Sequence, residues 1–148
     1  MTDFLQSTDY VGISFWIVSV AMFAATVFFF FEAMNVKSSW RISLVTVGLV
    51  TLIATIHYYY MRELWIYTKA SPIVYRYIDW LLTVPLQMIE FYLILVAAGL
   101  AVSSNVFWRL LLGTLVMLLG GYAGENGWLS PSVGFVIGMT GWVFIIFE

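Results

Sequence analysis

Charge is scarce in this sequence: only 9% of its 148 residues are Asp, Glu, Lys or Arg, whereas 63% are hydrophobic. A soluble domain carries about 25% charged residues, because its surface must face water. The shortage therefore argues against an ordinary soluble protein and favours a chain whose surface faces lipid. Aromatic residues make up 19% of the chain, and several lie near the ends of apolar runs, where an interfacial belt places them.

Cysteine is absent, which excludes disulfides and thiolate metal sites. The single histidine among eight acidic residues also argues against a metal centre built by the protein. No basic run suggests nucleic-acid binding. The N-terminus, MTDFLQSTDY, is acidic and lacks the basic start of a signal peptide, so the first apolar run is interpreted as a retained membrane span.

Five apolar runs follow one another, separated by short polar connections. A membrane-barrel strand is ~10 residues long with strict alternation, whereas about 20 apolar residues cross a bilayer as a helix. These runs are continuous and have helical length. The predicted fold class is therefore all-α, a polytopic transmembrane helix bundle that forms one domain. The predicted helices cover residues 10–33, 41–62, 72–98, 103–124 and 131–148.

Basic residues in the connections predict the orientation of the chain, since cytoplasmic loops are enriched in Lys and Arg. The first and third connections carry Lys37, Arg41 and Arg109. The opposite side carries Arg62 and Lys69. That side also carries the acidic residues Asp3, Asp9, Glu63 and Glu125. We expect the N-terminus to lie outside the cell.

The third predicted helix carries a row of polar residues. They are Arg76, Asp79, Thr83, Gln87 and Glu90. At about 100° of turn per residue they occupy an arc of roughly 80° on one face. A single Asp or Arg at the centre of a membrane helix costs about 2.5–3.5 kcal/mol even on lenient scales. A lone buried acid is often only a structural partner for a neighbouring helix, but a whole polar row indicates function. Pro85, within the row, is expected to kink the helix, with or without a functional role.

The two carboxylates of this row have opposite protonation preferences. Arg76 lies three residues before Asp79 on the same face, so we expect the two to pair and Asp79 to stay ionised. Glu90 has no basic residue within a turn, and loss of hydration favours its neutral form. One group that accepts a proton and one that donates are what a proton relay needs. They are separated by about 16 Å along the helix axis, so something must lie between them.

At these residues the chain resembles the microbial rhodopsins, and within them the proteorhodopsins. The run RYIDWLLTVPLQMIEFYLIL (76–95) is similar to the third helix of that family, and Asp79, Thr83 and Glu90 match its Asp-Thr-Glu motif for outward proton pumps. The likeness extends over the whole chain, through SFW (14–16), HYYYMR (57–62), LVMLLGGYAGE (115–125) and IGMTGWVF (137–144). It implies a seven-helix protein of the cell inner (plasma) membrane that holds retinal as a protonated Schiff base.

The resemblance also implies roles for single residues. Asp79 would be the counter-ion and primary proton acceptor, and Glu90 would be the cytoplasmic proton donor. Arg76 would tune the extracellular side. His57 would hydrogen-bond Asp79 and strengthen its hold on a proton, and would approach Trp16 of a neighbouring protomer in a ring-shaped homo-oligomer. Without the resemblance, a lone histidine on an apolar helix is more often a packing residue.

Retinal would be lined by residues of the third, fourth and fifth predicted helices. These are Trp80, Thr83, Gln87, Met117, Gly121 and Trp142. Gln87 stands at the position where the family changes colour, and a glutamine there resembles the blue-absorbing members. From the residues alone, the two tryptophans and Met117 are ordinary core or interface residues.

The sequence departs from the family in its lysines. The retinal lysine of the family lies in the seventh helix, whereas Lys37 and Lys69 fall in predicted connections, where neither reaches a pocket beside Asp79. The chain is therefore either the first five helices of a longer rhodopsin, which we favour because the last run has no polar tail, or a five-helix protein without retinal.

Three functions remain open at this stage. The leading hypothesis is a light-driven outward proton pump, a transporter rather than an enzyme. The alternatives are a photosensory rhodopsin that signals through a membrane partner, which commonly lacks a carboxylic donor at the position of Glu90, and a retinal-free helical membrane scaffold.

Overall fold

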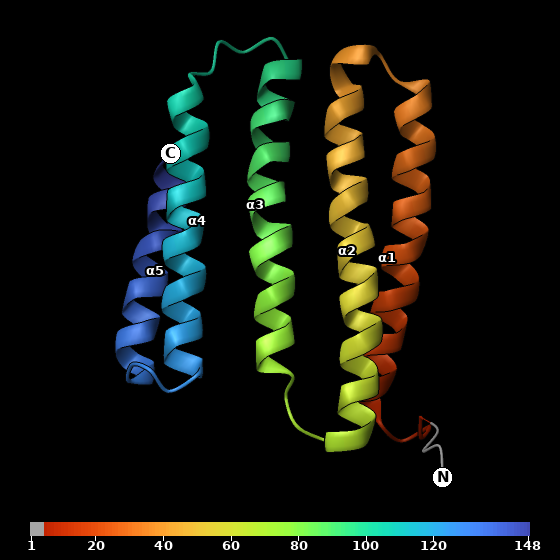
Figure 1. Ribbon diagram of the computed structural model, residues 1–148. Coiled ribbons are helices and arrows are strands. Elements are labelled where there is room, and N and C mark those ends of the chain that lie inside the picture. Colours follow the sequence, from red (N-terminus) through yellow and green to blue (C-terminus); the bar gives the residue numbers. More distant parts are fainter. Residues whose placement is uncertain (1–4) are drawn as a thin grey trace.

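The computed structural model describes residues 5–148, so Asp3 lies outside the described residues. The described chain forms the helices α1 (Tyr10–Asn35), α2 (Ser38–Thr68), α3 (Ile73–Ala97), α4 (Ser104–Glu125) and α5 (Pro131–Phe147) (Figure 1). The predicted all-α class is confirmed. Pro85 lies inside α3, and the helix continues through it.

The second helix is longer than predicted. It continues past Arg62 to its last residue, Thr68. The C-cap residue that follows, Lys69, has a left-handed backbone with a φ of 51°. The prediction stopped at the first charged residue, because it followed the apolar run. Helical hydrogen bonding does not need apolar side chains, so α2 extends beyond its apolar part.

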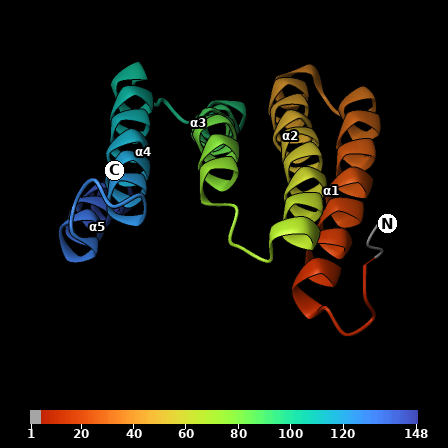
Figure 2. The same cartoon turned by 60° about the horizontal axis from the view of Figure 1, so that its bottom comes forward.

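The helices are arranged in chain order. Each of them contacts only its neighbours in sequence, and no other helix pair in residues 5–148 is in contact. Figure 2 shows the resulting open arc, with α3 in the middle. Four helices, α1 to α4, are long and apolar enough to cross a membrane, while α5 has 17 residues. The chain is a multi-pass membrane protein in which α3 has α2 on one side and α4 on the other.

Hydroxyl side chains fill the contact between α1 and α2. Ser19 and Thr26 of α1 and Thr46 and Thr51 of α2 are all buried. Thr26 Oγ1 donates to Thr51 Oγ1 across the interface at 2.9 Å. Small hydroxyl residues let two membrane helices approach closely while their polar atoms stay satisfied.

Asp9 joins the start of α1 to the end of α2. Its Oδ1 accepts the backbone N–H of Gly12 at 2.9 Å, and Trp65 Nε1 donates to the same oxygen at 3.0 Å. Lys69 Nζ donates to Oδ2 at 2.5 Å. The Lys69 ammonium, the Gly12 amide and the Trp65 indole together lower the pKa of Asp9 from 3.8 to about 2. Asp9 is therefore ionised throughout the physiological range.

The backbones of α4 and α5 touch at glycines. A Cβ atom at Gly141 of α5 would lie 2.6 Å from both the Gly113 carbonyl oxygen and the Met117 amide nitrogen of α4. A Cβ at Gly134 would lie 2.6 Å from the Gly124 Cα. These neighbours are backbone atoms, which a rotamer change cannot move. The two helices are held as close as glycine alone permits.

Replacing Asp9 should destabilise the protein in a pH-dependent way. A carboxylate whose pKa is lowered by folding contributes stability above its unfolded pKa, and this contribution is lost as the pH falls through the folded value. We expect Asp9→Asn to lower the thermal unfolding midpoint at neutral pH and the difference from wild type to vanish near pH 2. Glu63→Gln, at a half-buried carboxylate that pairs with Arg62 at 3.6 Å, serves as the control. A difference that is constant with pH would contradict this assignment.

Gly141→Ala should separate α4 from α5. The added methyl group has no space beside Gly113 and Met117, and overpacking of this kind costs about 1–3 kcal/mol. Gly138→Ala is the matched control one turn earlier, because its Cβ would lie 3.3 Å from the nearest atom, the Met117 carbonyl oxygen. Thermal unfolding in detergent should show a larger loss for Gly141→Ala, and equal losses would refute the close contact.

Candidate functional site

Asp79 is the buried carboxyl group of the middle helix. Its exposed fraction is 3%. His57 Nδ1 of α2 lies 3.6 Å from Asp79 Oδ1, too far for a hydrogen bond, and 3.0 Å from the Ile53 carbonyl oxygen, which can only accept. Within the described residues, Asp79 Oδ1 has no hydrogen-bond partner. A buried oxygen in this state is costly unless something else satisfies it.

The predicted ion pair between Arg76 and Asp79 is wrong. Arg76 Nη2 instead pairs with Glu125 Oε2 at the end of α4. Tyr77, the next residue of α3, donates its hydroxyl to Glu125 Oε1 at 3.1 Å. Side chains of a helix tilt toward its N-terminus, so the long side chain of Arg76 leads away from Asp79, which lies one turn further along.

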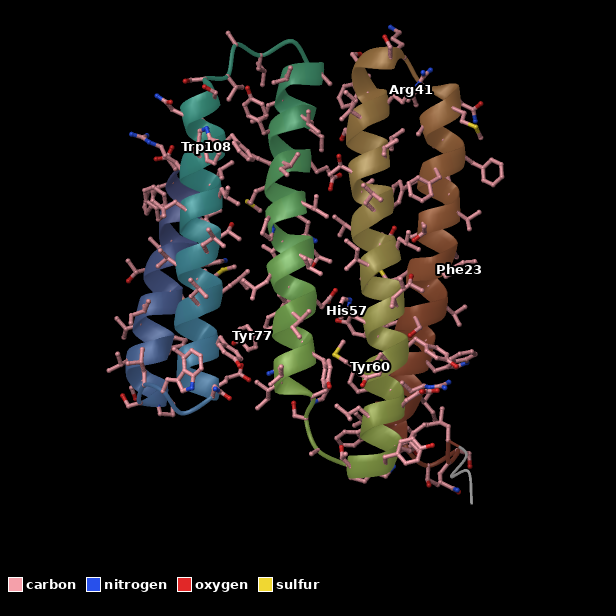
Figure 3. The ribbon with its side chains drawn as sticks, viewed as in Figure 1. Phe23, Arg41, His57, Tyr60, Tyr77 and Trp108 are labelled. Carbon is pink, nitrogen blue, oxygen red and sulfur yellow. The ribbon has the colours of Figure 1, made fainter. Side chains whose placement is uncertain are left out.

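The polar residues of α3 therefore contact both neighbouring helices, α2 and α4. Figure 3 shows His57 between α2 and α3, and Tyr77 between α3 and α4. Thr83 is buried one turn beyond Asp79 and donates to the Asp79 backbone carbonyl at 2.9 Å. Further along, Gln87 is exposed, while Glu90 is half-buried and has no hydrogen-bond or ion-pair partner in the described part of the chain.

Two adjoining pockets contain four of the six residues predicted to line retinal. One pocket, of about 320 Å³, is lined by Tyr77, Trp80, Val84, Met117 and Leu118. The other, of about 280 Å³, is lined by Met117, Gly121, Gly134, Phe135, Gly138, Met139 and Trp142. Met117 belongs to both. Thr83 and Gln87 line neither of the two. The lining is almost wholly apolar, which suits an apolar ligand.

Sequence reasoning missed several residues of this site. Tyr77 lies three residues before Trp80, and Gly138 lies four residues before Trp142. Residues at these spacings share a helix face, so the helical period held a signal for both. In the sequence, Glu125 bears only on the orientation of the chain in the membrane. Its contact with Arg76 joins residues 49 positions apart, and no local spacing predicts such a contact.

The remaining predicted residues lie away from this centre. Trp16 of α1 is 43% exposed, and its ring lies 5.0 Å from the Arg62 guanidinium carbon. Lys37 and Lys69 flank the two ends of α2, and Lys69 is paired with Asp9. In residues 5–148, no cluster of three or more His, Asp or Glu side chains is suited to hold a metal ion.

Comparison with known proteins identifies the family of this chain. The sequence model of the family described as bacteriorhodopsin-like protein matches residues 9–148. The chain belongs to the bacteriorhodopsin-like family. It is 54% identical over 144 residues to the blue-light absorbing proteorhodopsin of Gamma-proteobacterium Hot 75m4 and equally identical to the green-light absorbing proteorhodopsin of Gamma-proteobacterium EBAC31A08. Each match covers 97% of this chain and 57% of the relative, so the chain spans little more than half the length of these proteorhodopsins.

Solved rhodopsin structures match the fold. The blue light-absorbing proteorhodopsin from Med12 superposes with a TM-score of 0.85 at 52% identity, covering 94% of this chain and 66% of that one. Exiguobacterium sibiricum rhodopsin gives 0.80 at 30% identity, covering 92% and 61%. The viral rhodopsin OLPVRII shares the fold, with a TM-score of 0.83 at 22% identity. The resemblance to microbial rhodopsins that the third helix suggested is confirmed.

Proposed function

We propose that this chain provides the first five helices of a light-driven proton pump that uses retinal to move protons out of the cell. The observation that carries the proposal is Asp79, a carboxyl group buried in the middle helix with one oxygen left without a hydrogen-bond partner in the described residues. Such a group inside a membrane helix indicates function rather than stability.

The residues of the two adjoining pockets suit retinal, which members of the rhodopsin family bind. The apolar pockets would take its hydrocarbon part between Trp80, Met117, Gly121 and Trp142. The free Oδ1 of Asp79 suits a cationic end, because a buried carboxylate needs a positive partner. When bound, retinal supplies a light-sensitive cation that carries the proton to be moved. Lys37 and Lys69 lie at the ends of α2, so neither is the attachment point.

Different side chains of this chain then accept, hold and supply the proton. Asp79 takes up a proton at Oδ1, beside His57, whose Nδ1 lies 3.6 Å away. The Thr83 hydroxyl donates to the backbone carbonyl of Asp79 and so holds this turn of α3 in place. Glu90, half-buried and without an ionic partner among the described residues, holds a proton and supplies it from the cytoplasmic side. Arg76 near the start of α3 and Glu125 at the end of α4 lie at the opposite end of α3 from Glu90, and Figure 1 shows that α1 begins on this side.

The proposal extends to the surroundings of the protein. The basic residues of the connections support a plasma-membrane protein with its N-terminus outside. Gln87 supports blue absorption, because an amide near the polyene changes how charge along it is stabilised. Trp16, exposed on α1, is available to His57 of a neighbouring protomer in a ring-shaped homo-oligomer.

Illuminated cells that contain the full-length protein and retinal should acidify an unbuffered medium. Asp79→Asn should abolish the acidification, because the acceptor is lost. Glu90→Gln should retain the pigment but slow photocycle recovery by roughly tenfold or more, since a positioned proton donor is removed. Glu63→Gln, at a carboxyl group of α2 outside the row, should leave both readouts unchanged.

Other outcomes would favour the alternatives. Alkalinisation or an unchanged pH would refute outward pumping. A slow photocycle that does not respond to Glu90→Gln would favour a photosensory rhodopsin. A colourless full-length protein in the presence of retinal would favour a scaffold.

A further inference from the structure

Glu125 is held by two consecutive residues of α3. Its Oε2 pairs with Arg76 Nη2, and its Oε1 accepts the Tyr77 hydroxyl at 3.1 Å. Tyr77 is buried, and its ring packs edge-to-face against Trp80 and Tyr122, with centroids 5.1 Å apart in both pairs. The tyrosine therefore has little freedom, and it fixes the carboxylate that Arg76 binds.

Gly121 provides the space that this contact needs. A Cβ atom at Gly121, one turn before Glu125 on α4, would lie 2.8 Å from the Tyr77 hydroxyl oxygen. Any larger residue would push the hydroxyl away from its place beside Glu125. Gly121 and Tyr77 each line one of the two adjoining pockets, so the contact lies at the edge of the proposed retinal site.

The position of Arg76 decides which carboxyl group its charge stabilises. Arg76 lies three residues from Asp79 on the same helix, a spacing at which opposite charges can meet. In the structure its guanidinium is instead bound to Glu125 on the α4 side. A guanidinium released from Glu125 is free to turn toward Asp79.

We propose that Tyr77 and Gly121 are positioning residues that fix Glu125 and thereby hold the charge of Arg76 on the α4 side of α3, away from Asp79. The proposal rests on the proposed function, in which Asp79 must take up a proton. An arginine beside Asp79 would favour the carboxylate and oppose proton uptake.

The other groups around Asp79 come from both neighbouring helices. His57 of α2 lies 3.6 Å away, and Tyr58 of α2 is within electrostatic reach of both Asp79 and Arg76. From α4, Glu125 and Tyr122 both meet Tyr77 rather than Asp79. Arg76 is therefore the group whose position Tyr77 can change, whereas His57 and Tyr58 are untouched by substitutions on the α4 side.

Infrared titration of Asp79 in the retinal-free full-length protein tests this role. The protonated carboxyl band, assigned with Asp79→Asn, gives the pH at which half of Asp79 is protonated. Glu125→Gln should lower this midpoint by roughly one pH unit, as a nearby positive charge does. Tyr77→Phe and Gly121→Ala should lower it by a smaller amount, because they release Arg76 without removing a charge.

Two controls separate positioning from general damage. Tyr75→Phe makes the same chemical change two residues earlier, where the ring packs against Tyr60 of α2, and it should leave the midpoint unchanged. The double variant Tyr77→Phe/Glu125→Gln should titrate like Glu125→Gln alone, because both changes break one connection.

Each result bears on the proposal separately from pumping. A wild-type midpoint for Tyr77→Phe, an equal shift for Tyr75→Phe, or additive shifts in the double variant would overturn it. The titration needs neither retinal nor transport. A protein that fails to acidify the medium but shows these shifts would refute the pump and retain the positioning role.

Discussion

A carboxyl group inside a bilayer must be paired with a positive charge, be protonated or take part in function, and the contacts of α3 depend on this constraint. Asp79 is almost fully buried, and its nearest ionisable neighbour, His57, is too distant for a hydrogen bond. The basic residue of α3, Arg76, is bound to Glu125 instead. Asp79 Oδ1 thus has no positive partner among the described residues, and the proposed function assigns that place to a cationic ligand.

The sequence predicts the coarse features of this arrangement well. Apolar runs of bilayer length predict helices, and the helical period places the polar row on one face of α3. It does so because both signals are local: they depend only on residues within one element. The all-α class and the rhodopsin family are predicted from the same local patterns, and the structure and the comparisons confirm both. The continuation of α2 past Arg62 shows the limit of these local signals, because an apolar run marks the part of a helix that crosses the membrane and not the end of the helix.

The misassigned partner of Arg76 has a different cause. A helical wheel says which face a residue occupies, but not where the end of a long side chain lies. Arg76 and Asp79 share a face, yet the guanidinium extends toward the start of α3, where Glu125 of α4 is its neighbour. Contacts between residues so far apart in the chain depend on how the helices pack. The pocket around Met117 depends on packing in the same way.

Packing in turn depends on the residues that let the backbones approach. Hydroxyl residues join α1 to α2, and glycines join α4 to α5, so two closely packed pairs flank a central helix that touches one member of each. Helix α3 therefore lies between two different surfaces. Toward α2 it presents Asp79 to His57, and toward α4 it presents Arg76 and Tyr77 to Glu125. Both sets lie within one turn of α3, so a single turn of the central helix supplies different groups to its two neighbours.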